Sequence, residues 1–182
     1  MLLGLDLSAG ATLGIVGYGR IGQAVARRAR AFDMHVLATS SSRTVGTDPD
    51  GTTFLPLPEL LSRSDIVSLH TPLTPVTRHL IDGAALGRMK PSGYLINTAR
   101  GGIVDEAALI AALREGRIRG AALDVFEGEP LVDPDLLTLP NVILTPHTAS
   151  AGEATRDAMG LLAIANVAAV LRGEPAISRV VR

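Results

Sequence analysis

The sequence predicts an α/β fold with a doubly wound parallel sheet, and three observations support this fold class. Short apolar runs alternate with segments of helical spacing along the chain. The connections between these runs are short, as they are where crossover helices link parallel strands. A glycine-rich turn, Gly17-x-Gly19-x-x-Gly22, follows the first apolar run. We therefore expect one domain of Rossmann type over residues 1–182, with helices on both faces of the sheet.

In the amino-terminal half, the apolar run 13–16 predicts the first strand and 35–39 the second. The first helix is expected from 21 to 32, with an apolar stripe formed by Ile21, Ala24, Val25, Ala29 and Phe32. Polar residues at 40–43 and the turn signal Asp48-Pro49-Asp50-Gly51 predict a loop. A short helix at 58–63, with Pro58 in its first turn, and a strand at 65–69 follow.

In the carboxy-terminal half, Asp82 is expected to cap a helix at 82–89, ahead of a strand at 93–97. A helix at 105–115 has acids at its start and Gly116 just past its end, which the helix dipole and the C-terminal turn favour. Strands at 121–125 and 142–144 complete the sheet, and a long helix at 150–172 closes the domain. Residues 1–11 are expected to be a lead-in segment and 173–182 a tail.

The composition is that of a globular protein. The chain has 182 residues, of which 47% are apolar and 19% charged, and this is enough for one core. A net charge of −1 argues against nucleic acid as a partner. The absence of cysteine excludes disulfides, thiolate metal sites and a cysteine nucleophile, and no metal site is predicted.

No targeting or membrane segment is expected. Residues 1–11 carry no basic region before their leucines, unlike a signal peptide. The longest apolar stretch, 158–171, contains Gly160 and Asn166, and we expect it to be too short to span a bilayer and to pack as a helix on a core. The resulting expectation is a cytoplasmic protein without a membrane partner.

The glycine turn is typical of dinucleotide binding. Gly17 allows the tight turn, Gly19 lets the backbone approach a pyrophosphate, and Gly22 lets the helix lie close to the strand. The helix N-terminus offers unpaired N–H groups to the phosphates. A glycine-rich turn without a ligand has the same pattern, so the motif alone leaves both interpretations open.

Chemically distinctive residues follow the predicted strands at one edge of the sheet. They occupy five stretches: 40–43, 71–72, 98–100, 124–130 and 146–147. Ligands of such folds bind beyond the carboxyl ends of the strands, where these stretches would meet. Their convergence predicts a binding site more specifically than the glycines do.

At these positions the chain resembles the NAD-binding domain of the D-isomer-specific 2-hydroxyacid dehydrogenases, a family that includes phosphoglycerate dehydrogenase and glyoxylate/hydroxypyruvate reductase. The matching stretches run through nearly the whole chain: 13–22, 68–81, 97–109, 120–130 and 141–150. The resemblance implies hydride transfer between a nicotinamide cofactor and a 2-keto or D-2-hydroxy acid, which would be the small-molecule partner.

The resemblance places the catalytic residues at Arg100, Glu129 and His147. Arg100 offers a planar fork for the carboxylate and keto oxygen of the substrate. His147 would exchange a proton with the developing alkoxide, and Glu129 would accept a hydrogen bond from its other ring nitrogen. Taken singly, they could equally be a surface arginine, a solvated acid and a structural histidine, but together at strand ends they favour catalysis.

The cofactor contacts that the resemblance implies lie at the same strand ends. Asp124 would face the nicotinamide carboxamide. The other positions line its pocket or cover the pyrophosphate: Thr71, Thr98, Ala99, Arg20 and Ile21.

The residues after the second strand bear on the choice of nicotinamide cofactor. NAD-preferring relatives carry an acid there for the ribose 2′-hydroxyl, whereas this chain has Ser40. The hydroxyls of Ser40 and Ser41 and the guanidinium of Arg43 would bind a 2′-phosphate. We therefore predict NADP(H) in preference to NAD(H). The alternative is that Arg43 is only a solvated loop charge.

The family's substrate domain and most of its dimerisation arm have no counterpart in this sequence, so a homodimer stays open. We expect cofactor binding with weak or absent turnover, because nothing faces the cleft to exclude water. Three functions remain: a truncated oxidoreductase, a non-catalytic cofactor sensor or corepressor-like binding module, and an enzyme completed by a separate lid or by dimerisation. The paired acid and imidazole favour the first.

Overall fold

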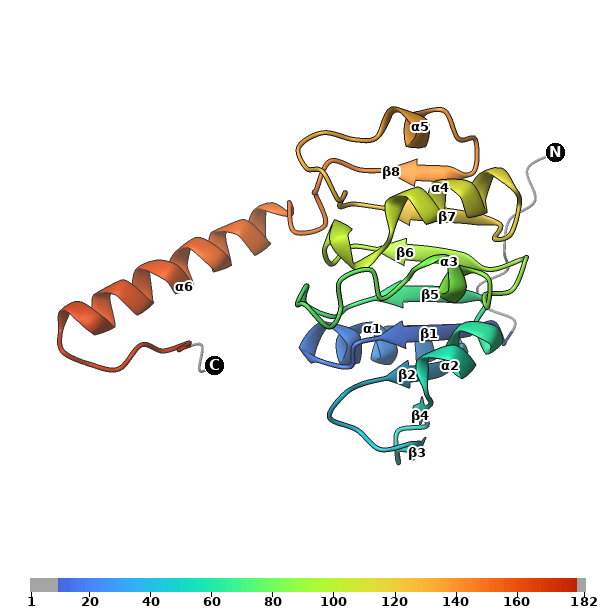
Figure 1. Ribbon diagram of the computed structural model, residues 1–182. Helices are drawn as coiled ribbons and strands as arrows, with labels where there is room; N and C mark the ends of the chain where they lie inside the picture. The colour runs from blue at the N-terminus through green and yellow to red at the C-terminus, as the bar shows by residue number, and fades with distance from the viewer. Residues whose placement is uncertain (1–9, 180–182) are drawn as a thin grey trace. The chain divides into compact units, whose positions relative to one another are not determined.

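The computed structural model describes residues 10–179, which form two compact units, 10–146 and 147–179. The first unit holds one sheet with the strand order β3-β4-β2-β1-β5-β6-β7-β8 (Figure 1). Its strands are β1 (Thr12–Val16), β2 (His35–Thr39), β3 (Gly46–Thr47), β4 (Thr53–Phe54), β5 (Ile66–Leu69), β6 (Tyr94–Asn97), β7 (Gly120–Leu123) and β8 (Val142–Leu144). The lead-in expected at 1–11 and the tail expected at 173–182 lie partly outside the described residues.

The helices lie between the strands as the alternating pattern predicts. Those of the first unit are α1 (Arg20–Arg30), α2 (Leu57–Arg63), α3 (Gly83–Leu86), the 3-10 helix η1 (Gly101–Ile103), α4 (Glu106–Arg114) and α5 (Pro134–Leu137). The second unit holds α6 (Glu153–Leu171). Asp82 and Asp105 cap α3 and α4 by accepting hydrogen bonds from backbone N–H groups three residues on.

The predicted parallel sheet is confirmed for neighbouring strands from β4 to β8. The hairpin of β3 and β4 adds one antiparallel pair, with Gly46 opposite Phe54 and Thr47 opposite Thr53. Each strand of this hairpin is two residues long, so neither produces an apolar period that a sequence could reveal.

The central strand β1 marks the point where the winding reverses. Ile15 of β1 pairs with Ala38 of β2 on one side and with Ser68 of β5 on the other. In open sheets of this kind, ligands bind at the carboxyl ends of the strands that flank such a reversal. The fold therefore directs attention to the loops after β1, β2 and β5.

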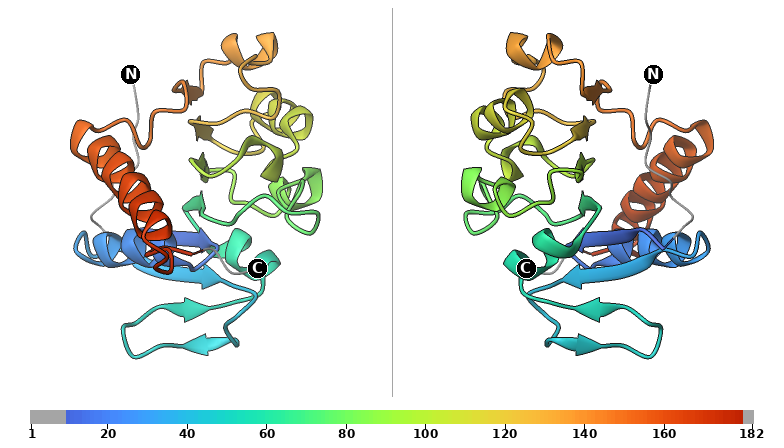
Figure 2. Two further views of the ribbon diagram at one scale, coloured as in Figure 1. Left: turned by 90° about the vertical axis from the view of Figure 1, so that its left-hand side faces the viewer. Right: turned by 90° about the vertical axis from the view of Figure 1, so that its right-hand side faces the viewer.

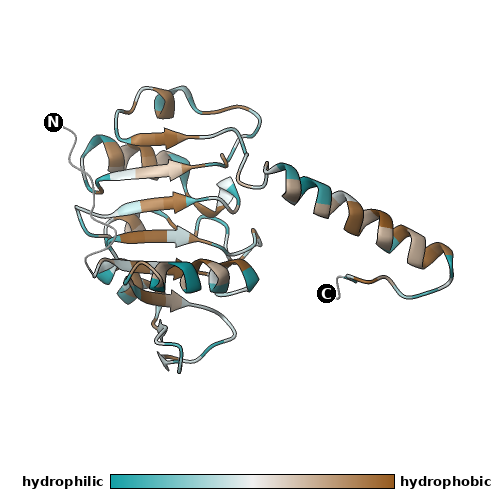
Figure 3. Cartoon of the chain, turned by 180° about the vertical axis from the view of Figure 1, so that it is seen from behind, coloured by the Kyte–Doolittle hydropathy of each residue, from teal (hydrophilic) through white to brown (hydrophobic). Residues whose placement is uncertain are grey.

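Two apolar cores lie on opposite faces of the sheet. Figure 2 shows α1 on one face and α2, α3 and α4 on the other. Between α1 and the sheet, Ile15, Ala26 and Phe54 are almost completely buried. Leu60, Leu86 and Leu95 belong to the larger core on the other face. This two-sided burial explains why the strands are apolar along most of their length (Figure 3).

The buried face of α1 matches the predicted stripe in its middle, where Ala29 is buried and Val25 packs on the core, but differs at both ends. Ile21 and Phe32 are 67% and 61% exposed, whereas Gly22, Ala26 and Ala29 are buried. A Cβ atom at Gly22 would lie 2.2 Å from the carbonyl oxygen of Gly17. The helix therefore turns its smallest side chains to the sheet, and close approach decides the face instead of side-chain hydrophobicity.

The second unit contains α6 and the chain that turns back after it. Asn166 of α6 exchanges hydrogen bonds with Ser178, at 2.8 Å to the hydroxyl and 3.0 Å from the backbone N–H. Leu161 and Ile164 are 68% and 66% exposed, and of α6 only Ala169 is buried. The second unit by itself therefore forms no core for 158–171 to pack on, and packing of this stretch on a core stays a prediction.

Helix α6 is also longer than the apolar stretch suggests. Its first turns are polar and the rest is mostly apolar (Figure 3). With 19 residues the whole helix is long and apolar enough to cross a membrane by length and composition, although its apolar stretch 158–171 is shorter. A single helix of this kind among the described residues is weak evidence for a membrane span.

Candidate functional site

The glycine turn after β1 is packed against the loop after β5. Gly17 has a positive φ of 96°, and a Cβ atom there would lie 2.7 Å from the carbonyl carbon of His70 and from the backbone nitrogen of Thr71. The Gly17 N–H donates a hydrogen bond of 3.0 Å to the Thr39 carbonyl at the end of β2. Only glycine satisfies both the dihedral angle and the space.

The amino terminus of α1 is open to a ligand. Gly19 is its N-cap, and no side chain accepts a hydrogen bond from the first turn. A Cβ atom at Gly19 would meet nothing within 4 Å. The first turn has no acidic residue and begins with Arg20, an arrangement that opposes the helix dipole but suits an anion.

A cavity of about 390 Å³ lies at this edge of the sheet. It contains five of the predicted cofactor residues: Gly17, Gly19, Ser40, Ser41 and Thr71. The other predicted positions are not part of its lining: Arg20, Ile21, Gly22, Arg43, Thr98, Ala99 and Asp124. Sequence reasoning missed several residues of the wall, above all Tyr18, Leu57, His70 and Leu80.

His70 lines the cavity wall beside Thr71. Its Nε2 atom lies 2.9 Å from the Ser68 hydroxyl. Burial lowers the pKa of His70 below its usual value, because a charged ring would lose its hydration there. The signal in the sequence was its place directly after β5, beside Thr71.

The loop after β6 holds Arg100 in a turn built by a buried amide. Asn97, which is 1% exposed, accepts from the Ala99 N–H at 3.0 Å and donates to the Arg100 carbonyl at 3.0 Å. The Arg100 guanidinium is exposed and donates to the carbonyl of Ala99 at 2.6 Å. Thr98 lies in the same turn. Asn97 therefore fixes the backbone while the Arg100 side chain faces solvent.

Asp124 is buried at the end of β7. The Thr145 hydroxyl donates to its carboxylate at 2.5 Å, and the Asp124 N–H donates to the Asn97 carbonyl at 2.9 Å. The loops after β6, β7 and β8 are thus joined by hydrogen bonds. Neither Asn97 nor Thr145 was a candidate site residue, because their role depends on partners distant in sequence.

The loop that carries Glu129 lies against the Arg100 turn. Glu129 accepts a hydrogen bond of 2.9 Å from the Phe126 N–H. A Cβ atom at Gly101 would lie 1.9 Å from the carbonyl carbon of Phe126, so the two backbones touch. The structure therefore brings Arg100 and Glu129 to neighbouring loops of one edge.

Glu127 ties the same loop to the chain after β5. Its carboxylate lies 2.7 Å from both the Arg78 guanidinium and the His79 ring. The Glu127 N–H donates to Glu106 at 3.1 Å. Burial, opposed by this hydrogen bond, raises the pKa of Glu106, and the charges of Asp133 and Glu127 add to the increase.

His147 begins the second unit, with a positive φ of 53°. Its predicted pairing with Glu129 would join the two units and stays a prediction. Among residues 10–179, no cluster of three histidine or acidic side chains could hold a metal ion.

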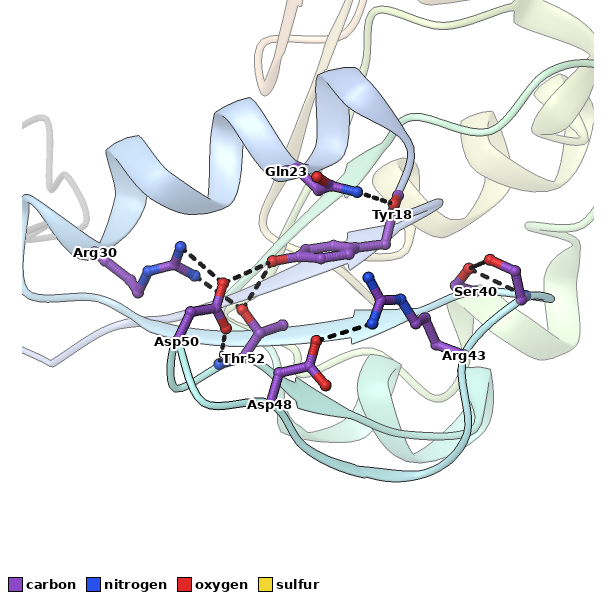
Figure 4. A network of polar contacts seen from close by, with 9 residues as sticks. Tyr18, Gln23, Arg30, Ser40, Arg43, Asp48, Asp50 and Thr52 are labelled. Carbon is purple, nitrogen blue, oxygen red and sulfur yellow. Dashed lines mark hydrogen bonds and ion pairs between the residues drawn. The ribbon is translucent and has the colours of Figure 1, made fainter.

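The loop after β2 presents Ser40, Ser41 and Arg43. The Ser40 and Ser42 hydroxyls are 3.1 Å apart, and the Ser42 N–H donates to Ser40 at 3.3 Å. Arg43 points away from these serines and forms an ion pair of 3.3 Å with Asp48 (Figure 4). The predicted phosphate-binding group therefore already has a carboxylate partner.

The chain is similar to known dehydrogenases along nearly its whole length. A family model described as "D-isomer specific 2-hydroxyacid dehydrogenase, NAD binding domain" matches residues 3–149. The chain is 51% identical to a glyoxylate reductase of Korarchaeum cryptofilum, over 96% of this chain and 53% of that protein. It spans about half the length of the curated glyoxylate reductases that it matches.

Solved structures of similar proteins also match nearly the whole of this chain and about half of their own. A protein of Thermus thermophilus is 50% identical, with a TM-score of 0.90 over 98% of this chain and 56% of that one. An NADPH-dependent glyoxylate/hydroxypyruvate reductase of Sinorhizobium meliloti, solved with NADP and malonate, is 41% identical, with a TM-score of 0.88 over 94% of this chain and 53% of that one.

Proposed function

The chain belongs to the D-isomer-specific 2-hydroxyacid dehydrogenase family, whose NAD-binding domain it carries, and from this premise we propose that it binds NADP(H) or NAD(H) for reduction of a 2-keto acid. The observation that carries the proposal is the open cradle at Gly19. There, an uncapped helix terminus and a cavity of about 390 Å³ meet at the switch point of the sheet.

The residues present suit a dinucleotide. The backbone N–H groups at the start of α1, with Arg20 beside them, would hold the pyrophosphate. Thr71 and His70 would line the space beyond it. Asp124, fixed by Thr145, would accept from a carboxamide at the nicotinamide end. When bound, the cofactor supplies the hydride, so the protein's share is orientation and electrostatics.

We assign the substrate chemistry to three side chains. The exposed guanidinium of Arg100 would bind the substrate carboxylate and polarise the keto group. His147 would donate a proton to the oxygen that becomes the alkoxide, and would take it back in the reverse direction. Glu129 would accept from the second ring nitrogen and favour the imidazolium.

Cofactor preference is proposed to lie with NADP(H). The lining residues at the end of β2 are hydroxyl side chains, Ser40 and Ser41, so no carboxylate at these positions would repel a 2′-phosphate. Arg43 follows on the same loop and would supply the counter-charge. The NADPH dependence of the Sinorhizobium meliloti relative supports this assignment.

The first test is a titration of the purified chain with NADPH and NADH, followed by nicotinamide fluorescence. Gly19→Asp places a carboxylate in open space, so we expect it to fold normally and to weaken both affinities at least about tenfold by repelling the pyrophosphate. Gly160→Asp adds the same charge on α6 at a site equally free of neighbours, and should leave binding unchanged. A parent chain that binds neither nucleotide would contradict the proposal.

The second test separates binding from chemistry. Glyoxylate, hydroxypyruvate and larger 2-keto acids are supplied to this chain, and to a version extended at both ends, with NADPH present. In whichever form turns over, His147→Ala should abolish turnover while the nucleotide dissociation constant stays within about twofold. Unchanged turnover would remove His147 from the mechanism.

The exposed apolar residues of α6 favour a second candidate function, a cofactor-dependent binding module without turnover. The same measurements distinguish it. A binding module would bind nucleotide in every form of the protein and reduce no keto acid in any.

A further inference from the structure

Arg43 is held at the edge of the cofactor cavity by two contacts. Its guanidinium pairs with Asp48 at 3.3 Å and lies 5.8 Å from the centre of the Phe54 ring. Both partners of the ion pair are partly exposed, Arg43 by 47% and Asp48 by 34%. The cavity reaches Ser40, Ser41 and Ser42 but is not lined by Arg43. The guanidinium is therefore next to the site while engaged elsewhere.

The position of Asp48 is fixed by its backbone. The Asp48 N–H donates to the Thr52 carbonyl at 2.9 Å, and the Gly51 N–H donates to the Asp48 carbonyl at 2.9 Å. These bonds close a turn at the end of the β3–β4 hairpin. The Asp48 carboxylate is therefore attached to a backbone position that hydrogen bonds hold in place.

The turn is in addition fastened to the glycine motif. The Tyr18 hydroxyl, between Gly17 and Gly19 in sequence, lies 2.9 Å from the Thr52 hydroxyl and donates to Asp50 at 3.4 Å. Arg30 pairs with Asp50 at 3.0 Å and donates to Thr52 at 2.8 Å (Figure 4). Asp48 is thus held at a set place relative to the cofactor turn itself.

We propose that Asp48 limits the preference of this chain for NADP(H) by competing with the 2′-phosphate for Arg43. The inference rests on the proposed function and names a determinant outside the serine–arginine stretch. A phosphate dianion that reaches Arg43 must either displace the Asp48 carboxylate or lie beside this second anion, and both effects weaken the binding of NADP(H). The 2′-hydroxyl of NAD(H) is uncharged, so neither effect weakens the binding of NAD(H).

Asp48→Asn is the direct test, because the amide keeps the size of the side chain and leaves the backbone turn intact. We expect the NADPH dissociation constant to fall about three- to tenfold at low salt, and the NADH constant to change less than about twofold. The gain should shrink as salt is raised, because an exposed charge is screened. In an Arg43→Ala background, the same substitution should give a smaller gain, since no guanidinium is left to release.

Asp135→Asn is the matched control. Asp135 forms an exposed ion pair of 2.7 Å with Arg114 on α4, and it lies on α5, near the far edge strand of the sheet. The substitution Asp135→Asn removes the same charge from the chain as Asp48→Asn, so a general effect of net charge on nucleotide binding would appear in both variants. We expect it to leave both dissociation constants unchanged, with circular dichroism confirming that each variant is folded.

The outcomes separate the two proposals. A parent chain that binds neither nucleotide overturns the proposed function and this inference together. If the parent binds nucleotide and Asp48→Asn leaves the NADPH-to-NADH ratio unchanged, only the inference fails. A loss of NADPH affinity in Asp48→Asn would show that Asp48 orients Arg43 for the phosphate, which also overturns it.

Discussion

Gly101 lies so close to Phe126 that a Cβ atom on the glycine would be 1.9 Å from the carbonyl carbon of the phenylalanine. The turn that carries Arg100 and the loop that carries Glu129 are therefore in backbone contact. Because both sides of the contact are backbone, no side-chain rotation can relieve it.

Gly101→Ala is expected to lower the free energy of unfolding of the first unit by about 2–4 kcal/mol, because the backbone must move to admit the methyl group. Chemical unfolding followed by circular dichroism measures the change. Gly128→Ala, in the loop that meets Gly101, is the control, since its Cβ would lie 3.7 Å from the Leu131 carbonyl oxygen, an ordinary contact. Equal effects of the two substitutions would contradict the close approach.

Glu106 makes stability depend on pH in a direction that follows from its raised pKa. The native state keeps the proton more tightly than the unfolded chain, so this contribution is full below the ordinary value of 4.5 and is lost as pH rises through the raised value. Glu106→Gln keeps an acceptor for the Glu127 N–H and should flatten this part of the profile. At neutral pH it should match or exceed the parent by up to about 0.5 kcal/mol, after allowance for solvent screening.

Unfolding titrations across the acidic range test this prediction. Glu106→Ala offers no acceptor to Glu127 and should be less stable than the glutamine variant at every pH. A parent whose stability rises with pH in step with Glu106 ionisation would disprove the assignment.

His70 is expected to titrate below its ordinary value of 6.5, because burial disfavours the charged ring. The stability that this residue contributes is present above 6.5 and is lost as pH falls through the lowered pKa. Nitrogen-detected NMR of the imidazole rings measures the midpoint, and the signal missing from His70→Gln assigns it. A midpoint at or above 6.5 would place the ring in solvent.

Arg43→Ala should raise the NADPH dissociation constant about tenfold, or about 1.4 kcal/mol, and that of NADH much less, because only NADPH carries the 2′-phosphate. Arg63→Ala removes an arginine paired with Glu59 on α2 and should affect neither nucleotide. Titrations at two salt concentrations check the electrostatic origin. Equal weakening of both nucleotides would make Arg43 a general anion contact.

The sequence was most informative for elements whose structure follows from their own residues alone. The strand predicted at 35–39 is β2 and the strand at 142–144 is β8, and the expected Asp82 cap is present. It was least informative for β3, β4, η1 and α5, which have four residues or fewer and show no period. The predicted face of α1 was wrong at its two ends, Ile21 and Phe32, because Gly22 must touch the Gly17 carbonyl, a requirement that hydrophobicity does not encode.

The candidate site divides in the same way. Strand ends located the edge, and Gly17, Gly19, Ser40, Ser41 and Thr71 do line its cavity. Thr145 and Glu127 were missed because their partners are distant in sequence. Asn97 and Asp48 were missed although their partners lie within five residues, because only the folded turns bring the side chains onto them. Each is a polar residue whose importance depends on what the fold places opposite it.

Gly17 packs directly against the backbone of His70 and Thr71, so the glycine turn after β1 and the loop after β5 are in close contact although they are some fifty positions apart in the sequence. A side chain at position 17 would therefore collide with backbone atoms of the second segment, the loop after β5. That second segment continues to Arg78 and His79, whose grip on Glu127 reaches the strip of chain bearing Glu129. The stretch of chain that touches the cofactor turn is therefore also the stretch that, through Glu127, is joined to the loop bearing Glu129.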